Sequence, residues 1–393
     1  MNITKFLVVI IILILLVLII PTCKEKDIII PSTVNPIRDS SITPSLIELI
    51  STPVVSIQLT QTPVVTFSPS PIKSPISSVT LINTIPEVLY NPYVFVTAWG
   101  TKGIGNGKFL NPGSIAVDSK AYVYVADGDK YCIQKFDSNG KFITKWGSEG
   151  KEKWQFSPGG IAVTPEGYIF IADKDYSRIE KFDSSGKFIN MWTDEGLDEE
   201  NCGRINIYDV AVDLDKNVYI ADTENGNSIH KFDSNGKFMK EFVSSKFPTS
   251  SYSYGQIVID KKGYIYAVYA IHPPPDSPCN GSYYSDFHIQ KFDSNGNFVR
   301  EFGSEGNKDG QFSSMIGLAI DDKGYIYTAD PAANRIQKFD SSGNFITKFG
   351  SKGNKDGQFN NPRGIVVDCK GNLYVVDAGN YRIQKFKPNP EFK

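Results

Sequence analysis

The residues best suited to bind a metal are three histidines, His230, His272 and His288, which are the only ones in the chain. A zinc ion requires three or four protein ligands, commonly His, Cys, Asp or Glu. His230 stands at a repeated position that is Gln134 in the first repeat and Gln in three others, so we interpret it as a packed side chain. His272 and His288 alone do not define a zinc site. We therefore predict no metal site and no cofactor.

Tyrosines accompany two of these histidines in the sequence. A Tyr ring offers a flat apolar face with a polar edge, which suits sugars and extended peptides. The pattern favours a ligand surface in this segment, and the alternative is that its loops have drifted on a face that binds nothing. The hypothetical ligand-binding residues are Tyr252, Tyr254, Tyr269, His272, Tyr283, Tyr284 and His288.

Nucleophilic catalysis needs a nucleophile beside a base, and no such pairing can be identified. The carboxylates of Asp118 and Asp213 recur in most repeats as turn residues, so they do not form a distinct acid–base set. No catalytic residues are predicted, and binding without catalysis is favoured over an enzyme. The formal net charge of −2, without a basic stripe, argues against nucleic-acid binding, which depends on neutralising phosphates.

The N-terminus predicts export. Lys5 precedes an apolar run of 15 residues, Phe6–Ile20, which as a helix spans roughly 22 Å, less than the ~30 Å core of a bilayer. Residues 1–22 therefore fit a signal peptide, with an uncleaved membrane anchor as the alternative. Ile20-Pro21-Thr22-Cys23 resembles a bacterial lipobox, in which Cys23 would be lipidated, although Thr22 replaces the usual smaller residue. We expect a membrane-attached protein on the extracellular or periplasmic face.

Residues 23–92 differ from the rest of the chain in being rich in Pro, Ser and Thr. Proline removes backbone donors and favours extended conformers, so this segment is expected to be a linker without a core of its own.

From residue 93 to residue 393 the chain repeats itself. The first repeat contains the apolar runs SIAVD, YVYVAD, CIQKFD and FITKWG, and the last two are joined by an Asp-Ser-Asn-Gly turn typical of hairpins. Corresponding first-run residues are spaced by 46, 49, 47, 61 and 47 residues, and they are Ile115, Ile161, Val210, Ile257, Leu318 and Ile365. Six units of about four strands predict an all-β, six-bladed propeller.

The sixth repeat lacks a fourth strand, because the chain runs out soon after Arg382–Phe386. The run Tyr93–Gly100 resembles the fourth strand of the other repeats and precedes the first of them. We therefore predict that this N-terminal strand closes the last blade, which removes the two edges of an open array.

Strings such as GQFNNPRGIVVD at Gly357–Asp368 and LYVVDAGNYRIQKF at Leu373–Phe386 resemble the NHL-repeat family, in its bacterial or archaeal surface type. The resemblance covers about residues 93–393 and implies a six-bladed β-propeller. Relatives include lyases, lactonase-like enzymes, RNA-binding modules and bacterial surface proteins. The expected function is thus a non-catalytic module that binds an extracellular polysaccharide, peptide or protein, and the alternative is an extracellular enzyme of lyase or lactonase type.

Strand alternation places the loops between second and third strands on one face, together with the connections between blades. An Asp that ends the second strand and an Arg that begins the third recur as Asp173/Arg178, and we interpret these pairs as structural. Blade four departs most, with Tyr269 and His288 in those positions. Cys202 and Cys279 are expected on this same face in adjacent blades, and we hypothesise a disulfide between them.

Overall fold

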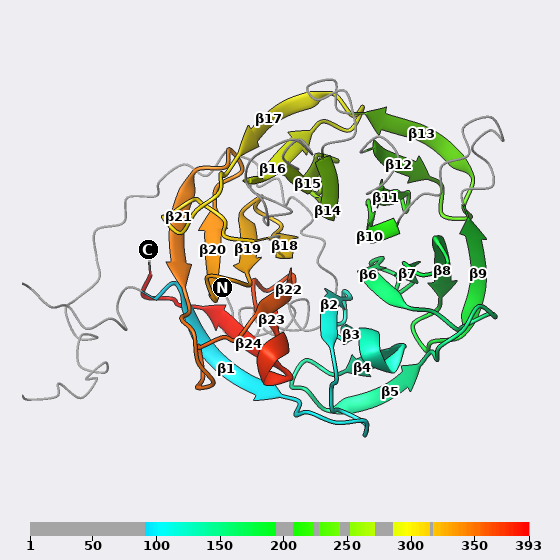
Figure 1. Ribbon diagram of the computed structural model, residues 1–393, viewed down its shortest axis with the longest axis horizontal. Helices are drawn as coiled ribbons and strands as arrows, with labels where there is room; N and C mark the ends of the chain where they lie inside the picture. The colour runs from blue at the N-terminus through cyan, green and yellow to red at the C-terminus, as the bar shows by residue number, and fades with distance from the viewer. Residues whose placement is uncertain are drawn as a thin grey trace, which may run out of the picture. The chain divides into compact units, whose positions relative to one another are not determined.

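The computed structural model describes residues 91–193, 207–222, 228–243, 252–271, 286–314 and 317–392, and these contain 24 strands. The strands form six four-stranded antiparallel sheets, arranged as blades around a central axis (Figure 1). The described residues include no α-helix, and their two 3-10 turns are η2 (Gly128–Lys130) and η4 (Ala378–Asn380). Within this part of the chain, no helix is long and apolar enough to cross a membrane. The predicted six-bladed propeller is confirmed.

In blades 1 to 5 the four strands follow one another in sequence from the axis to the rim, whereas blade 6 takes its outermost strand from the start of the propeller sequence. Blades 1 to 3 contain β2 (Pro112–Val117), β3 (Val123–Asp127), β4 (Cys132–Phe136) and β5 (Phe142–Trp146); β6 (Pro158–Val163), β7 (Ile169–Asp173), β8 (Arg178–Phe182) and β9 (Phe188–Thr193); β10 (Ile207–Val212), β11 (Val218–Asp222), β12 (Ser228–Phe232) and β13 (Phe238–Val243). Blades 4 to 6 contain β14 (Tyr252–Ile259), β15 (Ile265–Ile271), β16 (Asp286–Phe292) and β17 (Phe298–Phe302); β18 (Gly317–Ile320), β19 (Ile326–Asp330), β20 (Arg335–Phe339) and β21 (Phe345–Phe349); β22 (Pro362–Val367), β23 (Leu373–Asp377), β24 (Arg382–Pro388) and β1 (Tyr93–Trp99).

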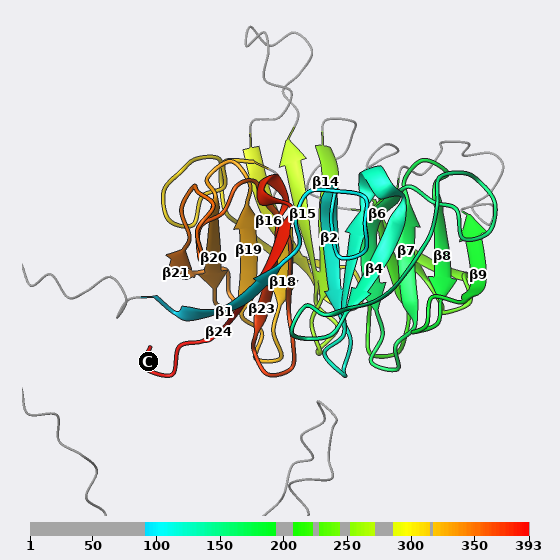
Figure 2. The ribbon, with the colours of Figure 1, turned by 90° about the horizontal axis from the view of Figure 1, so that it is seen from below.

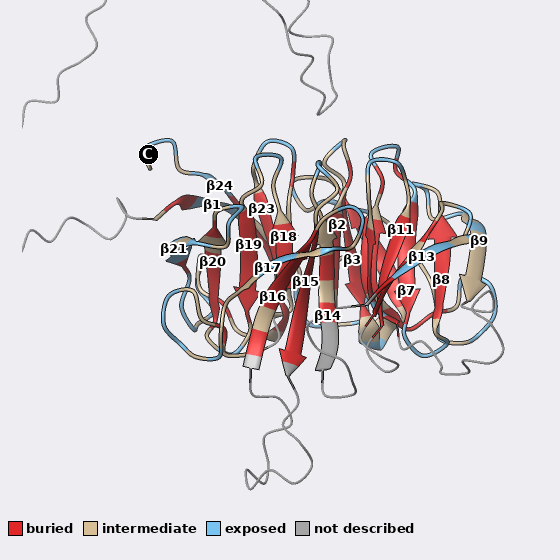
Figure 3. Ribbon diagram, turned by 90° about the horizontal axis from the view of Figure 1, so that it is seen from above, coloured by how far each residue is buried: buried red, intermediate tan, exposed pale blue. Residues whose placement is uncertain are grey.

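Burial decreases from the second strand of a blade to its outermost strand. All five residues of β3 are buried, whereas those of β5 alternate between half-buried and exposed. Figure 3 shows the same gradient, with buried inner strands and exposed outer segments. Inner strands are covered on both faces by neighbouring blades, which explains why their sequences are continuous apolar runs rather than alternating ones. The outer strands have one neighbouring strand and meet solvent, so their sequences alternate.

The turn between the first and second strands is held by one recurring contact. In five blades, a Tyr on the second strand donates from its buried hydroxyl to the Asp that opens this turn, as Tyr124 does to Asp118 at 3.0 Å. Blade 2 has Phe170 in place of the Tyr and Thr164 in place of the Asp. Both partners are therefore replaced together, so no buried hydroxyl loses its acceptor.

The ring closes as the sequence predicted. β1 pairs antiparallel with β24, from Tyr93 opposite Pro388 to Trp99 opposite Ile383 (Figure 2). Blade 6 is also tied to blade 1, because Lys385 Nζ donates to the Ser138 carbonyl at 2.7 Å. The N-terminal strand thus supplies the outer edge of the blade in which the chain ends.

Candidate functional site

A channel along the axis is lined by the first strand of every blade. We call the end at which these strands begin the upper mouth, and the end at which they finish the lower mouth. The two ends can be compared because each is built from equivalent residues of six blades. A binding site specific to this protein is expected where those residues differ from blade to blade.

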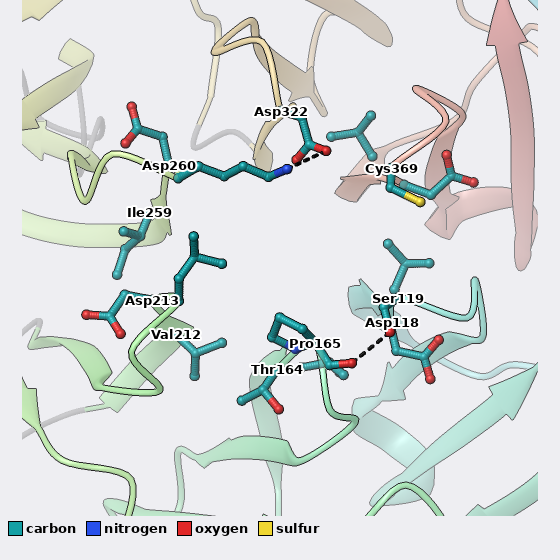
Figure 4. A pocket seen from close by; sticks show the side chains of 16 residues that line it. Asp118, Ser119, Thr164, Pro165, Val212, Asp213, Ile259, Asp260, Asp322 and Cys369 are labelled. Carbon is teal, nitrogen blue, oxygen red and sulfur yellow. Dashed lines mark hydrogen bonds and ion pairs between the residues drawn. The ribbon is translucent and has the colours of Figure 1, made fainter. Parts of the chain in front are cut away.

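The lower mouth is built mainly from turn residues. It is a cavity of about 220 Å³ whose wall includes Val212, Ile259 and the turn carboxylates (Figure 4). These carboxylates serve their own turns: Asp118 Oδ1 accepts from the backbone N–H of Lys120 and Tyr122, both at 2.9 Å. In Figure 4 the carboxylates of Asp118, Asp213 and Asp260 point away from the centre. The interpretation of such Asp residues as turn residues is confirmed.

The upper mouth is a cavity of about 250 Å³, and here the blades differ. In blades 2, 5 and 6 the residue just before the first core position is a glycine that allows neighbouring strands to approach closely. A Cβ atom on Gly317 would lie 1.9 Å from the Arg363 carbonyl oxygen. Other blades place larger side chains around this opening. The side chains that distinguish the upper mouth are Ser114, Lys174, Tyr208, Asp209, Gln256 and Arg363.

Three of these side chains join adjacent blades by accepting a backbone N–H of the next blade. Ser114 Oγ accepts from Ile161 N at 3.3 Å. Asp209 Oδ2 accepts from Ile257 N at 3.1 Å, and Gln256 Oε1 accepts from Leu318 N at 2.6 Å. The polar residues at the mouth are therefore fixed in position by the strands that they link.

Asp209 is the acidic residue in the described wall of the upper mouth, and it is only 5% exposed. Burial raises the pKa of its carboxyl group to about 7, against the opposing effect of the N–H groups of Ile257 and Val210. Both protonation states are thus populated near neutral pH. Tyr208, the preceding residue, is 46% exposed at the same opening.

Arg363 belongs to blade 6, which lies opposite the blade of Tyr208 in the ring of six. It is half-buried, and its Nη1 donates to Asn111 Oδ1 at 2.6 Å. Asn111 is itself fixed, because its Nδ2 donates to Asp129 Oδ1 at 2.9 Å. Among the described residues, no carboxylate lies within the 4.0 Å ion-pair distance of the Arg363 guanidinium.

The recurring Arg residues of the third strands behave differently from Arg363. Arg178 Nε lies 3.0 Å from Asp173 Oδ2, and its guanidinium also donates to the Gln155 carbonyl in the loop that leads into blade 2. Arg382 repeats this arrangement with Asp377 at 2.8 Å. In both pairs the Asp is fully buried and the Arg connects it to the loop that leads into the blade, so the prediction that these pairs are structural is confirmed.

Comparison with known proteins agrees with the sequence repeat. The family model for the NHL repeat matches residues 359–386, which include β22, β23 and most of β24. The chain is thus a six-bladed β-propeller that carries an NHL repeat.

Solved structures are similar to the NHL-repeat propeller to different degrees. A structural genomics protein of unknown function from Bacteroides thetaiotaomicron is 15% identical, with 76% of each chain covered and a TM-score of 0.56. Virginiamycin B lyase from Staphylococcus aureus is 12% identical, with 75% of this chain and 99% of that chain covered and a TM-score of 0.49. Kuenenia stuttgartiensis hydrazine synthase is 10% identical, with 73% and 99% covered and a TM-score of 0.49. No curated protein sequence matches the chain. The Bacteroides likeness shows the fold alone, and none of the three transfers a function.

Two of the ligand-binding residues hypothesised from the sequence lie together in the NHL-repeat propeller. The rings of Tyr269 and His288 stack with centroids 5.2 Å apart. Tyr269 is 2% exposed, and its Oη donates to Glu301 Oε2 at 2.9 Å. This pair occupies the position of the Asp–Arg pairs in other blades. Tyr252 and Tyr254 belong to β14, but their side chains lie outside the description, as do His272, Tyr283 and Tyr284 altogether.

The cysteines of the NHL-repeat propeller are described only in part. Cys132 on β4 is buried and is a free thiol, and burial raises its pKa to about 11. Cys23, Cys202 and Cys279 lie outside the described residues, so lipidation and the hypothesised disulfide stay predictions. Within the described ranges, no group of three or more His, Cys, Asp or Glu residues could hold a metal ion.

Sequence reasoning missed the residues that surround the upper mouth of the NHL-repeat propeller. The signal was present in the two positions before each first core residue. Blade 1 has Gly113-Ser114 there, whereas blade 3 has Tyr208-Asp209 and blade 6 has Arg363-Gly364. Comparing these positions between repeats would have identified the residues that surround the channel opening.

Proposed function

We propose that this NHL-repeat propeller is a non-catalytic binding module at the cell surface, and that it takes its ligand at the upper mouth. The ligand class is an extracellular glycan, peptide or protein. One observation carries the proposal: the side chains that break the repeat gather around one cavity, where Tyr208, Asp209 and Arg363 replace smaller residues. A rigid scaffold with variable residues at one opening is the usual arrangement of a binding site.

The chemistry of the cavity supports recognition of a polar ligand. Tyr208 presents a partly exposed ring, and Gln256 and Asn111 bring amide groups to the same opening. Aromatic faces beside a few fixed polar groups are typical of sites that bind sugars or peptides. The positions are preorganised, because Gln256 and Asp209 are held by backbone groups of the neighbouring blade.

The hypothesised tyrosines of blade 4 extend the proposed surface. Tyr252 and Tyr254 belong to the same strand as Gln256, on its upper side, and the backbone of Tyr254 pairs with that of Tyr269. A ligand at the upper mouth that continues outward would pass along this strand. We therefore keep both tyrosines in the proposed ligand surface, together with His272, Tyr283 and Tyr284.

Attachment to the membrane is a further part of the proposal, and its support comes from the sequence alone. Residues 1–22 would serve as a signal peptide or an anchor, and Cys23 would carry the lipid if the segment is cleaved. The Pro-rich residues 23–92 would hold the propeller away from the bilayer.

The alternative is an enzyme of lyase or lactonase type, and one observation favours it. A buried carboxyl group with a pKa near 7 at a cavity, as in Asp209, is suited to general acid–base catalysis. The alternative predicts turnover of a bound ligand that Asp209→Asn abolishes without loss of binding, or a stoichiometric transition metal in the purified protein.

The test is a glycan and peptide array probed with the full chain, followed by titration of the strongest ligand. Tyr208→Ser changes the upper mouth, and Leu214→Ser is the matched control because Leu214 is 57% exposed at the lower mouth. We expect Tyr208→Ser to weaken binding at least about tenfold, as for loss of a ring that stacks on the ligand. Equal binding by both variants and the unchanged protein would contradict the proposal.

A further inference from the structure

We propose that Arg363 is an anion-binding residue and that the upper mouth recognises a carboxylate group, as on an acidic sugar. This inference rests on the proposed function, since it names the chemistry of the ligand that the upper mouth takes. It concerns a residue that the Asp–Arg pairs of the repeat do not involve.

Arg363 occupies a position where three of the other repeats have a glycine. The equivalent residues in blades 1, 2 and 4 are Gly113, Gly159 and Gly255. A guanidinium has five N–H donors in a planar fork, and one of them is engaged by Asn111 Oδ1 at 2.6 Å. No carboxylate among the described residues is close enough to form an ion pair with it. Arg363 lines the upper mouth, and we infer that its remaining donors can bind a ligand there.

The charge at the upper mouth also favours an anion. Its described wall contains two cationic side chains, Lys174 and Arg363, and one acidic side chain, Asp209. The carboxyl group of Asp209 is buried and faces N–H donors of the neighbouring strand, so it does not neutralise Arg363 on the opposite side of the ring. Two cations at a concave opening concentrate anions there.

The neighbours of Arg363 favour a planar anion. Asn111 accepts from the guanidinium, while its own Nδ2 is fixed by Asp129 at 2.9 Å and its carbonyl oxygen accepts from Gly128 N at 3.0 Å. The guanidinium is thus oriented before any ligand arrives. An oriented fork matches the two oxygens of a carboxylate in a bidentate contact, which gives both affinity and geometric selectivity.

The size of the cavity limits the ligand. At about 250 Å³ it is smaller than the ~300–1,000 Å³ of pockets for drug-sized molecules. It therefore admits one small group rather than several units of a polymer. Tyr208, on the opposite side, is a partly exposed aromatic residue, a type that suits contact with the ring of a sugar. One acidic sugar residue satisfies the charge, the size and the aromatic contact together.

The experiment is isothermal titration of the full chain with sodium glucuronate, with glucose as the uncharged match and inorganic phosphate as the competing anion. We expect glucuronate to bind more tightly than either. Arg363→Gln should weaken glucuronate binding at least about tenfold. Arg300→Gln is the matched control, because Arg300 is exposed on β17 and donates to the Ser342 carbonyl, and it should leave binding unchanged.

Several outcomes would overturn the inference: glucose or phosphate binding as tightly as glucuronate, no glucuronate binding, or unchanged binding by Arg363→Gln. If Arg363→Gln does not fold, Arg363→Lys keeps the charge and loses the fork, and it should bind glucuronate several-fold more weakly than the unchanged protein. If the protein binds a neutral glycan, and Tyr208→Ser abolishes that binding while Arg363→Gln leaves it unchanged, this inference would be overturned and the proposed function would stand. Insensitivity of every array ligand to Tyr208→Ser would instead remove the proposed function.

Discussion

The hydroxyl group of Tyr93 donates to that of Tyr327 at 2.8 Å, across 234 positions of sequence. Tyr93 begins β1, whereas Tyr327 belongs to β19 of blade 5, and Tyr327 in turn donates to Asp321 Oδ2 at 2.9 Å. Tyr93 is 3% exposed and packs against Phe349, with ring centroids 5.5 Å apart. The closing strand is therefore fastened to blade 5 as well as to its own blade.

Tyr93→Phe tests this contact. Burial raises the pKa of Tyr93 to about 12, so its hydroxyl remains a donor throughout the neutral range. Removing that hydroxyl should lower the free energy of unfolding by about 1 kcal/mol, the usual net value of one buried hydrogen bond. Tyr168→Phe is the control, since Tyr168 is 38% exposed at the surface of blade 2. Equal stabilities of the two variants in urea denaturation would contradict the role of the contact.

Deletion of residues 93–99 tests closure of the ring. Without β1, β24 becomes the outer strand of blade 6 and exposes its unpaired backbone groups along the edge. We expect the full chain with this deletion to aggregate and to unfold at a lower temperature, as measured by size-exclusion chromatography and calorimetry. A monomer with unchanged thermal stability would mean that closure by β1 is dispensable.

Gly140 and Trp99 provide a test of packing between blades at the rim. Gly140 has a φ of +87°, and a Cβ atom there would lie 2.4 Å from the Trp99 ring. Gly357 has a similar φ of +76° but nothing within 4 Å of its Cβ position. Gly357→Ala should therefore lower the free energy of unfolding only through backbone strain at the positive φ. Gly140→Ala should lower it by at least about 1 kcal/mol more, because the added Cβ atom overpacks against Trp99. Equal losses in denaturant titrations would show that Trp99 moves away without cost.

Asp209 predicts a pH dependence of stability. Burial raises its folded-state pKa from 3.8 to about 7, so the folded protein holds this proton more tightly than the unfolded chain. Stability should fall as pH rises between these values, by about 1.4 kcal/mol per pH unit for this group. Asp209→Asn removes this pH-dependent contribution to the free energy of unfolding.

The measurement for Asp209 is the free energy of unfolding of both proteins from about pH 5 to pH 8. The free energy of unfolding of the unchanged protein minus that of Asp209→Asn should decrease as pH rises, and it should stop changing above about pH 7. Glu180, whose pKa burial also raises to about 7, is common to both proteins and cancels in the difference. A difference that does not change with pH would show that Asp209 titrates as it does in the unfolded chain.

Much of the fold could be predicted because the same pattern of strands and turns recurs in every repeat. The spacing from Ile115 to Ile365 predicts six blades, and the missing fourth strand after Phe386 predicts that Tyr93–Gly100 closes the ring. Each strand or turn pattern is supported by its recurrence in the other repeats. The contact of Tyr93 with Tyr327 had no such signal, because it occurs at the single place where the array is joined.

The candidate site was harder to predict because it lies where repeats differ. Tyr269 and His288 were hypothesised to bind a ligand because they replace an Asp–Arg pair. In the structure their rings stack on one another at the position of that pair. Arg363 sits in a segment that otherwise follows the repeat closely. Its significance depends on the ring geometry, which brings blade 6 opposite blade 3 and leaves Arg363 beside Asn111 of blade 1.

Hydrogen–deuterium exchange of the full chain, with and without the strongest ligand from the array, tests the central claim most directly. A ligand at the upper mouth should slow exchange in Ile207–Val210 and Pro362–Ile365, which surround that cavity. Exchange in the lower turns at 118–122 and 368–372 should not change. Protection confined to those lower turns, with Ile207–Val210 unaffected, would contradict the assignment of the upper mouth as the ligand site.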